Sequence, residues 1–279
     1  MQTYKNIKEL ASTPAAKLYL AEGSKDGVIH VVKQIACFDS KEKKGCLKAA
    51  YSIQETRMLF FLRHRHIIEL RDFYVSGDHF HIVMEYCSKG DLSKYIVDHI
   101  ERKEHFHQDQ IMMYFMQICE GIAFAHDTDV IHRDIKPQNL FVATETCIKV
   151  GDFGVGKLLQ SADEQVEGAR TGTRAYMAPE VYNKEKYTSK ADVWGIGVVL
   201  FEMLTLTLPH VGFSVTFDFD KIPTGYPPIF RQLCEMMLRL DPAERPTVRQ
   251  VLEKVHASGS VPAFMQKGGT RAGVGLVFE

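Results

Sequence analysis

The chain has 279 residues, of which 45% are apolar and 25% are charged, and its formal net charge is −1 at pH 7. This composition is typical of a globular protein with one large domain or two closely packed lobes. The balanced charge argues against nucleic-acid and membrane-surface partners, and no apolar run reaches the roughly 18 residues that a membrane span needs.

Cysteine usage indicates a reducing compartment. The six cysteines form no Cys-x-x-Cys pair and are spread through otherwise apolar segments. This pattern favours buried thiols over a disulfide framework or a zinc site. The first eight residues are polar and do not have the pattern of a signal peptide. We therefore expect a cytoplasmic protein.

The first part of the chain is mostly strand-like. Segments 18–22 and 28–38 alternate or run apolar with β-branched residues, and a glycine-flanked turn joins them. A helix is predicted over roughly 47–63, and two further strands are predicted to form a hairpin around the turn at 76–78. These elements predict a small β-rich lobe with one main helix over residues 1–86.

The second part of the chain is mostly helical. Apolar residues recur at helical spacing over 108–126, 190–205 and 246–255. These helices predict a larger lobe over residues 87–256, so the expected fold class is α+β with two lobes. Glycine becomes frequent over 257–279, where we expect a flexible tail.

Residue types that can take part in catalysis are concentrated in the larger lobe. Residues 131–140 read Ile-His-Arg-Asp-Ile-Lys-Pro-Gln-Asn-Leu, and a charged surface loop is the alternative interpretation of this stretch alone. Further motifs follow in order: Gly-Asp-Phe-Gly at 151–154, Gly-Thr-Arg-Ala-Tyr-Met-Ala-Pro-Glu at 172–180, Asp-Val-Trp-Gly at 192–195 and Arg-Pro-Thr at 245–247. Their joint order favours a functional site.

This ordered set of motifs resembles the protein kinase family over about residues 4–256. The resemblance implies the two-lobed kinase fold, ATP and Mg²⁺, and transfer of the γ-phosphate to a protein hydroxyl. Lys136, two residues after the loop aspartate, is similar to the lysine of Ser/Thr kinases. The flanking segments look most like the NIMA-related kinases, which implies a protein substrate with a Ser or Thr acceptor.

Resemblance to the NIMA-related group also implies partners and a location. Cytoskeletal, centrosomal or ciliary proteins are the expected partners, and association with the cytoskeleton is the expected location within the cytoplasm. The long coiled-coil tail of that group is missing from this sequence, so we expect a monomer.

The resemblance assigns roles to the loop residues. Asp134 would accept the hydrogen bond of the substrate hydroxyl and take its proton, and Lys136 would lie near the transferring phosphoryl group. Asn139 and Asp152 supply oxygen ligands of the kind that Mg²⁺ prefers. Asn139 is therefore expected to serve both catalysis and metal binding.

The small lobe is expected to bind ATP. Lys33 resembles the lysine that holds the phosphates, and Glu55 on the following helix is its expected partner. Met84 would lie at the back of the adenine pocket, and Glu85–Cys87 would form the hinge that bonds adenine through its backbone. The other residues expected at the nucleotide are Leu10, Leu18, Val31 and Phe141.

Fold-supporting contacts also follow from the resemblance. Asp192 is expected to anchor the catalytic loop, and Glu180 is expected to pair with Arg245 inside the larger lobe. The residues expected to stack between the two lobes are Leu59, Leu70, His132 and Phe153.

The phosphate-binding turn departs from the family pattern. Residues 11–16 read Ala-Ser-Thr-Pro-Ala-Ala, with Ala11, Thr13 and Ala16 at the positions of the family's three glycines. Pro14 has no backbone N–H to offer a phosphate oxygen. Val31 replaces a smaller alanine that faces adenine. A kinase with weakened ATP binding is therefore expected, and a pseudokinase that acts as a scaffold or allosteric partner is the alternative.

Arg133, beside Asp134, suggests control through a phosphorylated loop over residues 155–177. Thr171 is the hydroxyl nearest to the usual acceptor position, and Ser161 is the alternative acceptor. Thr173 matches a residue that more often contacts the catalytic loop. Three acidic residues in the loop could supply standing negative charge near Arg133. The hypothesis is that activity depends less on loop phosphorylation than in relatives.

Overall fold

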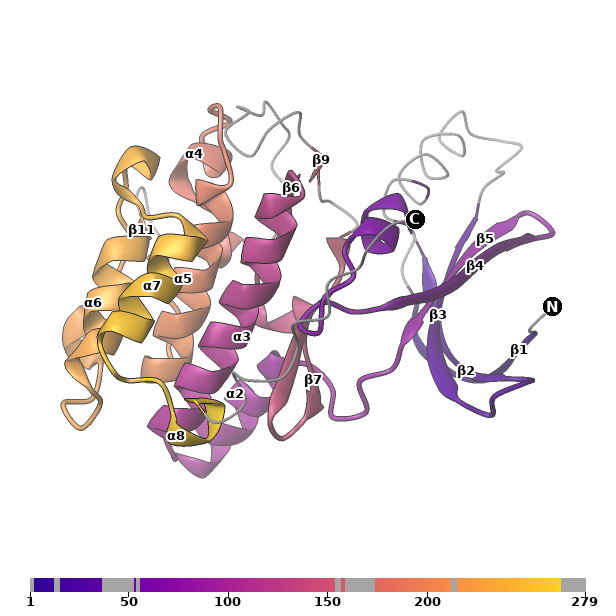
Figure 1. Cartoon of the computed structure of the whole chain (residues 1–279), viewed down its shortest axis with the longest axis horizontal. Coiled ribbons are helices and arrows are strands. Elements are labelled where there is room, and N and C mark those ends of the chain that lie inside the picture. Colours follow the sequence, from indigo (N-terminus) through magenta and orange to yellow (C-terminus); the bar gives the residue numbers. More distant parts are fainter. Residues whose placement is uncertain are drawn as a thin grey trace, which may run out of the picture.

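The structure is a computed structural model that describes residues 3–12, 16–36, 53, 56–153, 157–158, 174–211 and 215–266. It has two lobes, a β-sheet on one side and a larger helical body on the other (Figure 1). The two-lobed α+β prediction is confirmed. No helix within the described ranges is long and apolar enough to cross a membrane.

The small lobe is built on a five-stranded antiparallel sheet with the order β1-β2-β3-β5-β4. Its strands are β1 (Tyr4–Ser12), β2 (Lys17–Gly23), β3 (Ile29–Ala36), β4 (Leu70–Ser76) and β5 (His79–Glu85). The predicted hairpin turns at Gly77, whose φ of 55° is a conformation that glycine adopts without steric cost. Of the predicted helix at 47–63, the structure describes residue 53 and residues 56–63, and 56–61 are helical.

The larger lobe is mainly helical. Its helices are α2 (Leu92–Arg102), α3 (Gln108–Asp127), α4 (Pro179–Tyr182), α5 (Lys190–Thr205), α6 (Pro228–Met237), α7 (Val248–Ala257) and α8 (Ala263–Gln266). Its short strands are β6 (Val130–Ile131), β7 (Leu140–Thr144), β8 (Cys147–Val150), β9 (Lys157–Leu158), β10 (His210–Val211) and β11 (Val215–Thr216). Its 3₁₀ turns are η1 (Pro137–Asn139), η3 (Arg174–Tyr176), η4 (Phe219–Lys221) and η5 (Pro242–Glu244).

The three helices predicted from periodicity are present as α3, α5 and α7. The third begins two residues later than predicted, because Thr247 caps it. The Thr247 hydroxyl accepts from the Gln250 N–H at 3.2 Å, and the Gln250 side chain accepts from the Thr247 N–H at 2.8 Å. This reciprocal capping box fixes the helix start after Pro246 rather than at it.

One continuous hydrophobic core joins the two lobes. The backbone of residues 66–68 bonds to β8: the Val150 N–H donates to His66 at 2.9 Å, and the Ile68 N–H donates to Val150 at 2.8 Å. Gly121 of α3 packs against the same segment, and a Cβ there would lie only 2.7 Å from the His66 carbonyl oxygen. The close approach explains a glycine in the middle of a buried helix.

Residues expected to stack between the lobes lie in this core. Leu59, His132 and Phe153 are buried, and Leu70, at the start of β4, packs against the same hydrophobic core. The His132 and Phe153 rings meet edge to face with centroids 4.6 Å apart.

Part of the predicted tail carries structure that the sequence analysis did not predict. α8 lies within it, and Met265 of this helix packs against the core. The predicted tail after residue 266 lies outside the described residues.

Candidate active site

A cavity of about 700 Å³ lies between the sheet and the larger lobe, a size typical of small-molecule sites. The residues predicted at the nucleotide that line it are Leu10, Leu18, Val31, Lys33, Met84, Glu85, Cys87, Asn139, Phe141 and Asp152. Lining residues that the sequence analysis did not predict include Ile68, Lys94 and Gln138. The structure therefore brings residues from both lobes to one site.

Lys33 and Asp152 face each other across this cavity. The Lys33 Nζ lies 3.5 Å from the Asp152 Oδ1, and the Asp152 side chain is 47% exposed. Asp152 has a left-handed φ of 58°, which is rare outside glycine and commonly marks functional sites. Burial tends to raise the pKa of Asp152, but Lys33, His132 and Lys136 outweigh it and hold that pKa below its ordinary value. The carboxylate is therefore ionised at neutral pH.

The catalytic-loop residues converge on Asp134. The Lys136 Nζ donates to the Asp134 Oδ2 at 2.6 Å. The Asn139 amide donates to the same oxygen at 3.1 Å and to the Asp134 carbonyl at 2.8 Å. Asn139 ends the turn η1, which brings its side chain back to the aspartate. Asp134 is thus held as an acceptor by its two predicted neighbours.

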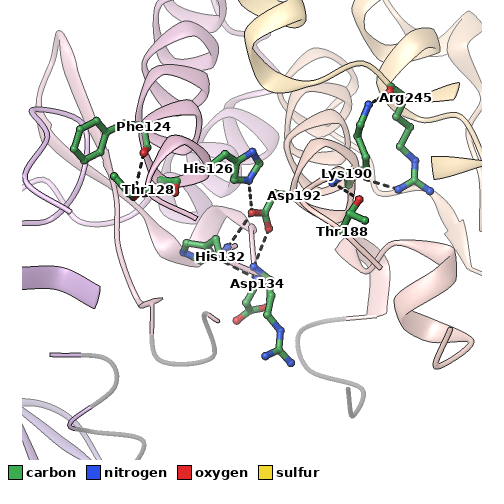
Figure 2. A network of polar contacts seen from close by, with 11 residues as sticks. Phe124, His126, Thr128, His132, Asp134, Thr188, Lys190, Asp192 and Arg245 are labelled. Carbon is green, nitrogen blue, oxygen red and sulfur yellow. Dashed lines mark hydrogen bonds and ion pairs between the residues drawn. The ribbon is translucent and has the colours of Figure 1, made fainter. Parts of the chain in front are cut away.

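Asp192, at the start of α5, holds the catalytic loop by hydrogen bonds, as the sequence analysis expected (Figure 2). Its Oδ2 accepts from the His132 N–H at 2.9 Å and from the His126 Nε2 at 2.8 Å. Its Oδ1 accepts from the Arg133 N–H at 2.8 Å. Burial tends to raise the pKa of Asp192, but these donors lower it. The ionised carboxylate fixes a loop in which Arg133 has a φ of 73°.

The predicted pair between Glu180 and Arg245 is present and fully buried. The Arg245 Nη1 and Nη2 donate to the two Glu180 oxygens at 2.7 and 2.8 Å. The remaining donors of the guanidinium bond to the carbonyls of Arg239, Lys190 and Leu240. Every N–H group of this buried cation has an acceptor, so its desolvation is compensated.

The hinge segment shows two contacts that the sequence analysis missed. The Glu85 carboxylate accepts from the Lys149 Nζ and from the Glu69 N–H, each at 2.7 Å. The Glu85 N–H also donates to the Glu69 carbonyl at 3.0 Å, so this N–H and one carboxylate oxygen of Glu85 are already engaged within the protein. Burial raises the pKa of Cys87 to about 12, so its thiol is neutral at pH 7.

Several predicted site residues lie outside the described residues. They are Glu55, Thr13, Pro14, Thr171 and Thr173. Their predicted roles stay predictions. Arg133 is described, and its guanidinium lies over the ring of Tyr187, 5.6 Å from the centroid.

The residues present fit a divalent cation and a triphosphate. Asp152 projects an ionised carboxylate into the cavity, and the Asn139 side chain lines the same wall. Hard oxygen ligands of this kind suit Mg²⁺, which would neutralise phosphate charge when bound. Lys33 adds a fixed cation at the same place.

The fold and this arrangement define a protein kinase. A family profile described as the protein kinase domain matches residues 4–256, and the chain belongs to this family.

Among individual proteins, the chain is 30% identical over 275 residues to serine/threonine-protein kinase Nek1 of Mus musculus, covering 95% of this chain and 22% of Nek1. It is 31% identical over 276 residues to serine/threonine-protein kinase Nek5 of Homo sapiens, covering 95% of this chain and 38% of Nek5. It is 30% identical over 265 residues to the probable serine/threonine-protein kinase nek3 of Dictyostelium discoideum, covering 91% of this chain and 23% of nek3.

The predicted resemblance to the NIMA-related Ser/Thr kinases is confirmed, and kinases of this family use ATP and Mg²⁺. The chain spans less than two fifths of the length of each of these three relatives.

Proposed function

We propose that this chain is a protein Ser/Thr kinase that transfers the γ-phosphate of ATP to a protein hydroxyl, with weakened binding of ATP. The observation that carries the proposal is the convergence of Lys33, Asp152 and Asn139 on one cavity, with Asn139 hydrogen-bonded to Asp134. These groups come from both lobes. Stability of the fold alone does not require these polar side chains to converge on one cavity.

Each group has a defined task in phosphoryl transfer. Lys33 holds the phosphates by charge, and Asp152 with Asn139 supplies the oxygen ligands for Mg²⁺. Asp134 orients the acceptor hydroxyl and takes its proton as the new bond to phosphorus forms, while the bond from the γ-phosphorus to the bridging oxygen breaks and ADP leaves. Lys136, 2.6 Å from Asp134, stabilises negative charge on the transferring group. Positioning and charge neutralisation supply most of the catalysis in this reaction class.

Weakened ATP binding is proposed from the phosphate-binding turn. Pro14 removes one N–H donor, and Thr13 is β-branched where the backbone of a glycine approaches phosphate closely. A lost hydrogen bond to a charged oxygen costs about 1.5–3 kcal/mol, which is roughly a tenfold or greater loss of affinity. Val31, which lines the cavity, narrows the space for adenine further.

The same turn favours the second candidate function, a pseudokinase that serves as a scaffold or allosteric partner. In that case the site would keep its geometry without turnover. The partners proposed from the family resemblance, cytoskeletal and centrosomal or ciliary proteins, apply to both candidates, as does a cytoplasmic location. Reduced dependence on loop phosphorylation is proposed only for the active kinase.

A transfer assay with labelled ATP and a generic Ser/Thr protein substrate separates the two candidates. We expect slow transfer with a high KM for ATP, abolished by Asp134→Asn. Replacing Thr13 and Pro14 together by Gly and Ser is expected to lower the KM for ATP about tenfold with little change in kcat. If the wild-type protein and the variant with Gly and Ser in place of Thr13 and Pro14 are both folded and neither transfers phosphate, the pseudokinase function is established instead.

A further inference from the structure

A second cavity, of about 260 Å³, lies between residues 59–65, the start of β4 and β8, and we call it the 59–70 groove. No described residue lines both this groove and the nucleotide cavity. Small-molecule sites typically measure roughly 300–1,000 Å³, so the groove suits one or two side chains of a peptide better than a whole small ligand.

The groove combines buried apolar residues with an exposed aromatic side chain. Leu59 and Leu62 are each 1% exposed, and Leu70 packs against the same core. Phe60, which also lines the groove, is 50% exposed. The ring of the exposed Phe61 meets the Phe60 ring edge to face, with centroids 5.7 Å apart. Two neighbouring exposed aromatic rings beside a cavity are a feature of interaction surfaces, in which aromatic residues are enriched.

Positive charge prevails among the residues that line the groove. Arg63, Arg65 and Lys149 supply three cations, and Glu69 supplies the one carboxylate. This carboxylate is already paired, because the Arg71 Nη2 lies 3.0 Å from the Glu69 Oε2. An acidic ligand therefore meets a complementary charge in the groove.

The two arginines keep hydrogen-bond donors for a ligand. Arg65 donates to Glu120 at 2.7 Å through Nη2, and Arg63 makes no ion pair within the described part of the chain. The Arg63 guanidinium lies over the Phe60 ring, 5.3 Å from the centroid, and carries five N–H donors. Burial lowers the pKa of His64, which also lines the groove, so its ring is neutral at pH 7 and adds no charge.

One ion pair links the groove to the nucleotide cavity. The Lys149 Nζ donates to the Glu85 Oε1 at 2.7 Å, and Glu85 lines the nucleotide cavity. Leu59 and Leu70 of the groove also belong to the residues that stack between the two lobes. A partner seated in the groove therefore contacts residues that connect the lobes and hold the hinge.

We propose that the 59–70 groove binds an acidic segment of a partner protein, with an aromatic side chain packed on Phe60 and carboxylates on Arg63 and Arg65. The proposal goes beyond the proposed kinase function and applies equally to a pseudokinase. Exposed charge pairs contribute about 1.5- to 5-fold each in affinity, and an aromatic anchor that becomes buried contributes more.

The test uses three fluorescein-labelled peptides and measures their binding to the purified chain by fluorescence anisotropy without nucleotide. One peptide contains Glu-Asp-Phe-Asp-Glu, the second has alanine in place of the phenylalanine, and the third has the neutral amides in place of the four acids. We expect the first to bind about fivefold or more tighter than either of the others, and its advantage over the neutral peptide to shrink as salt rises. Equal binding of either altered peptide, or no binding of the first, overturns the proposal.

Arg63→Glu and Phe60→Ala test the residues named. Both side chains are exposed, so we expect both variants to fold, which a circular-dichroism melt checks. Each is expected to weaken binding of the acidic phenylalanine peptide about fivefold or more. The matched controls are Arg239→Glu and Leu240→Ala, at exposed positions outside the groove, and they should change binding by less than about twofold. Equal effects of the groove variants and the controls would refute the proposal.

Sedimentation of the wild-type chain and of Arg63→Glu tests the other occupant, a second copy of this chain. We expect both proteins to be monomers at the concentrations of the binding assay. A wild-type dimer that Arg63→Glu dissociates would make the second copy the occupant and overturn the proposal. Neither readout uses phosphate transfer, so failure of the proposed kinase function leaves the test of the groove intact.

Discussion

Asp192→Ala should be among the most destabilising single substitutions in this chain. The Asp192 carboxylate is 1% exposed and accepts from the backbones of His132 and Arg133 and from the His126 ring, all at 2.8–2.9 Å. Hydrogen bonds to a charged group contribute about 1.5–3 kcal/mol each, and breaking such a buried set costs about 3–5 kcal/mol. For a chain of this size, this loss lowers Tm by roughly 5–9 °C.

Thermal and urea unfolding followed by circular dichroism measure this loss directly. The substitution Asp98→Ala, at a partly exposed position of α2, serves as the control and is expected to change Tm by less than 2 °C, or about 0.5 kcal/mol. Asp192→Asn keeps one acceptor oxygen and should lie between the two. A Tm for Asp192→Ala within the range of the control would show that the loop does not depend on this carboxylate.

Three further predictions concern the core and can be checked by the same unfolding measurements. Arg245→Lys keeps the charge beside Glu180 but loses the bidentate hydrogen bonding, so we expect the free energy of unfolding to fall by about 2–3 kcal/mol. An unchanged free energy of unfolding would contradict this prediction. Gly121→Ala should lower the free energy of unfolding by about 1–3 kcal/mol, because the added Cβ would meet the His66 carbonyl oxygen. A Tm equal to or above that of the wild type would contradict this prediction. Burial raises the pKa of Glu202 from 4.5 to about 7, so the folded state holds an extra proton between these values. Stability should therefore fall by about 3 kcal/mol as pH rises through this window, and Glu202→Gln should remove that dependence; an unchanged pH profile would refute it.

Features carried by short motifs were predictable from the sequence. The loop around Asp134, the anchoring of that loop by Asp192 and the pair between Glu180 and Arg245 each follow from residue types in a fixed order. The resemblance to kinases supplied their roles, and periodicity supplied the helices α3 and α5. These features depend on local sequence or on a family-wide pattern.

Features that depend on tertiary contact were not predictable. The bond between Lys149 and Glu85 joins residues 64 positions apart, and neither residue type signals the other. The approach of α3 to the His66 carbonyl is visible in the sequence only as a glycine within a helix. α8 is too short for periodicity to mark it in a glycine-rich context. The stacking of Arg174 on Tyr182 likewise needs the fold.

The most direct test of the central claim, that this cavity binds ATP with Mg²⁺ for phosphoryl transfer, is thermal unfolding under ATP titration. A ligand that binds only the folded state raises Tm by mass action, by about 2–3 °C at ten times the dissociation constant. We predict a rise at millimolar ATP that requires Mg²⁺ and is lost in Asp152→Ala. No rise at any attainable ATP concentration, or an equal rise in Asp152→Ala, would contradict the account.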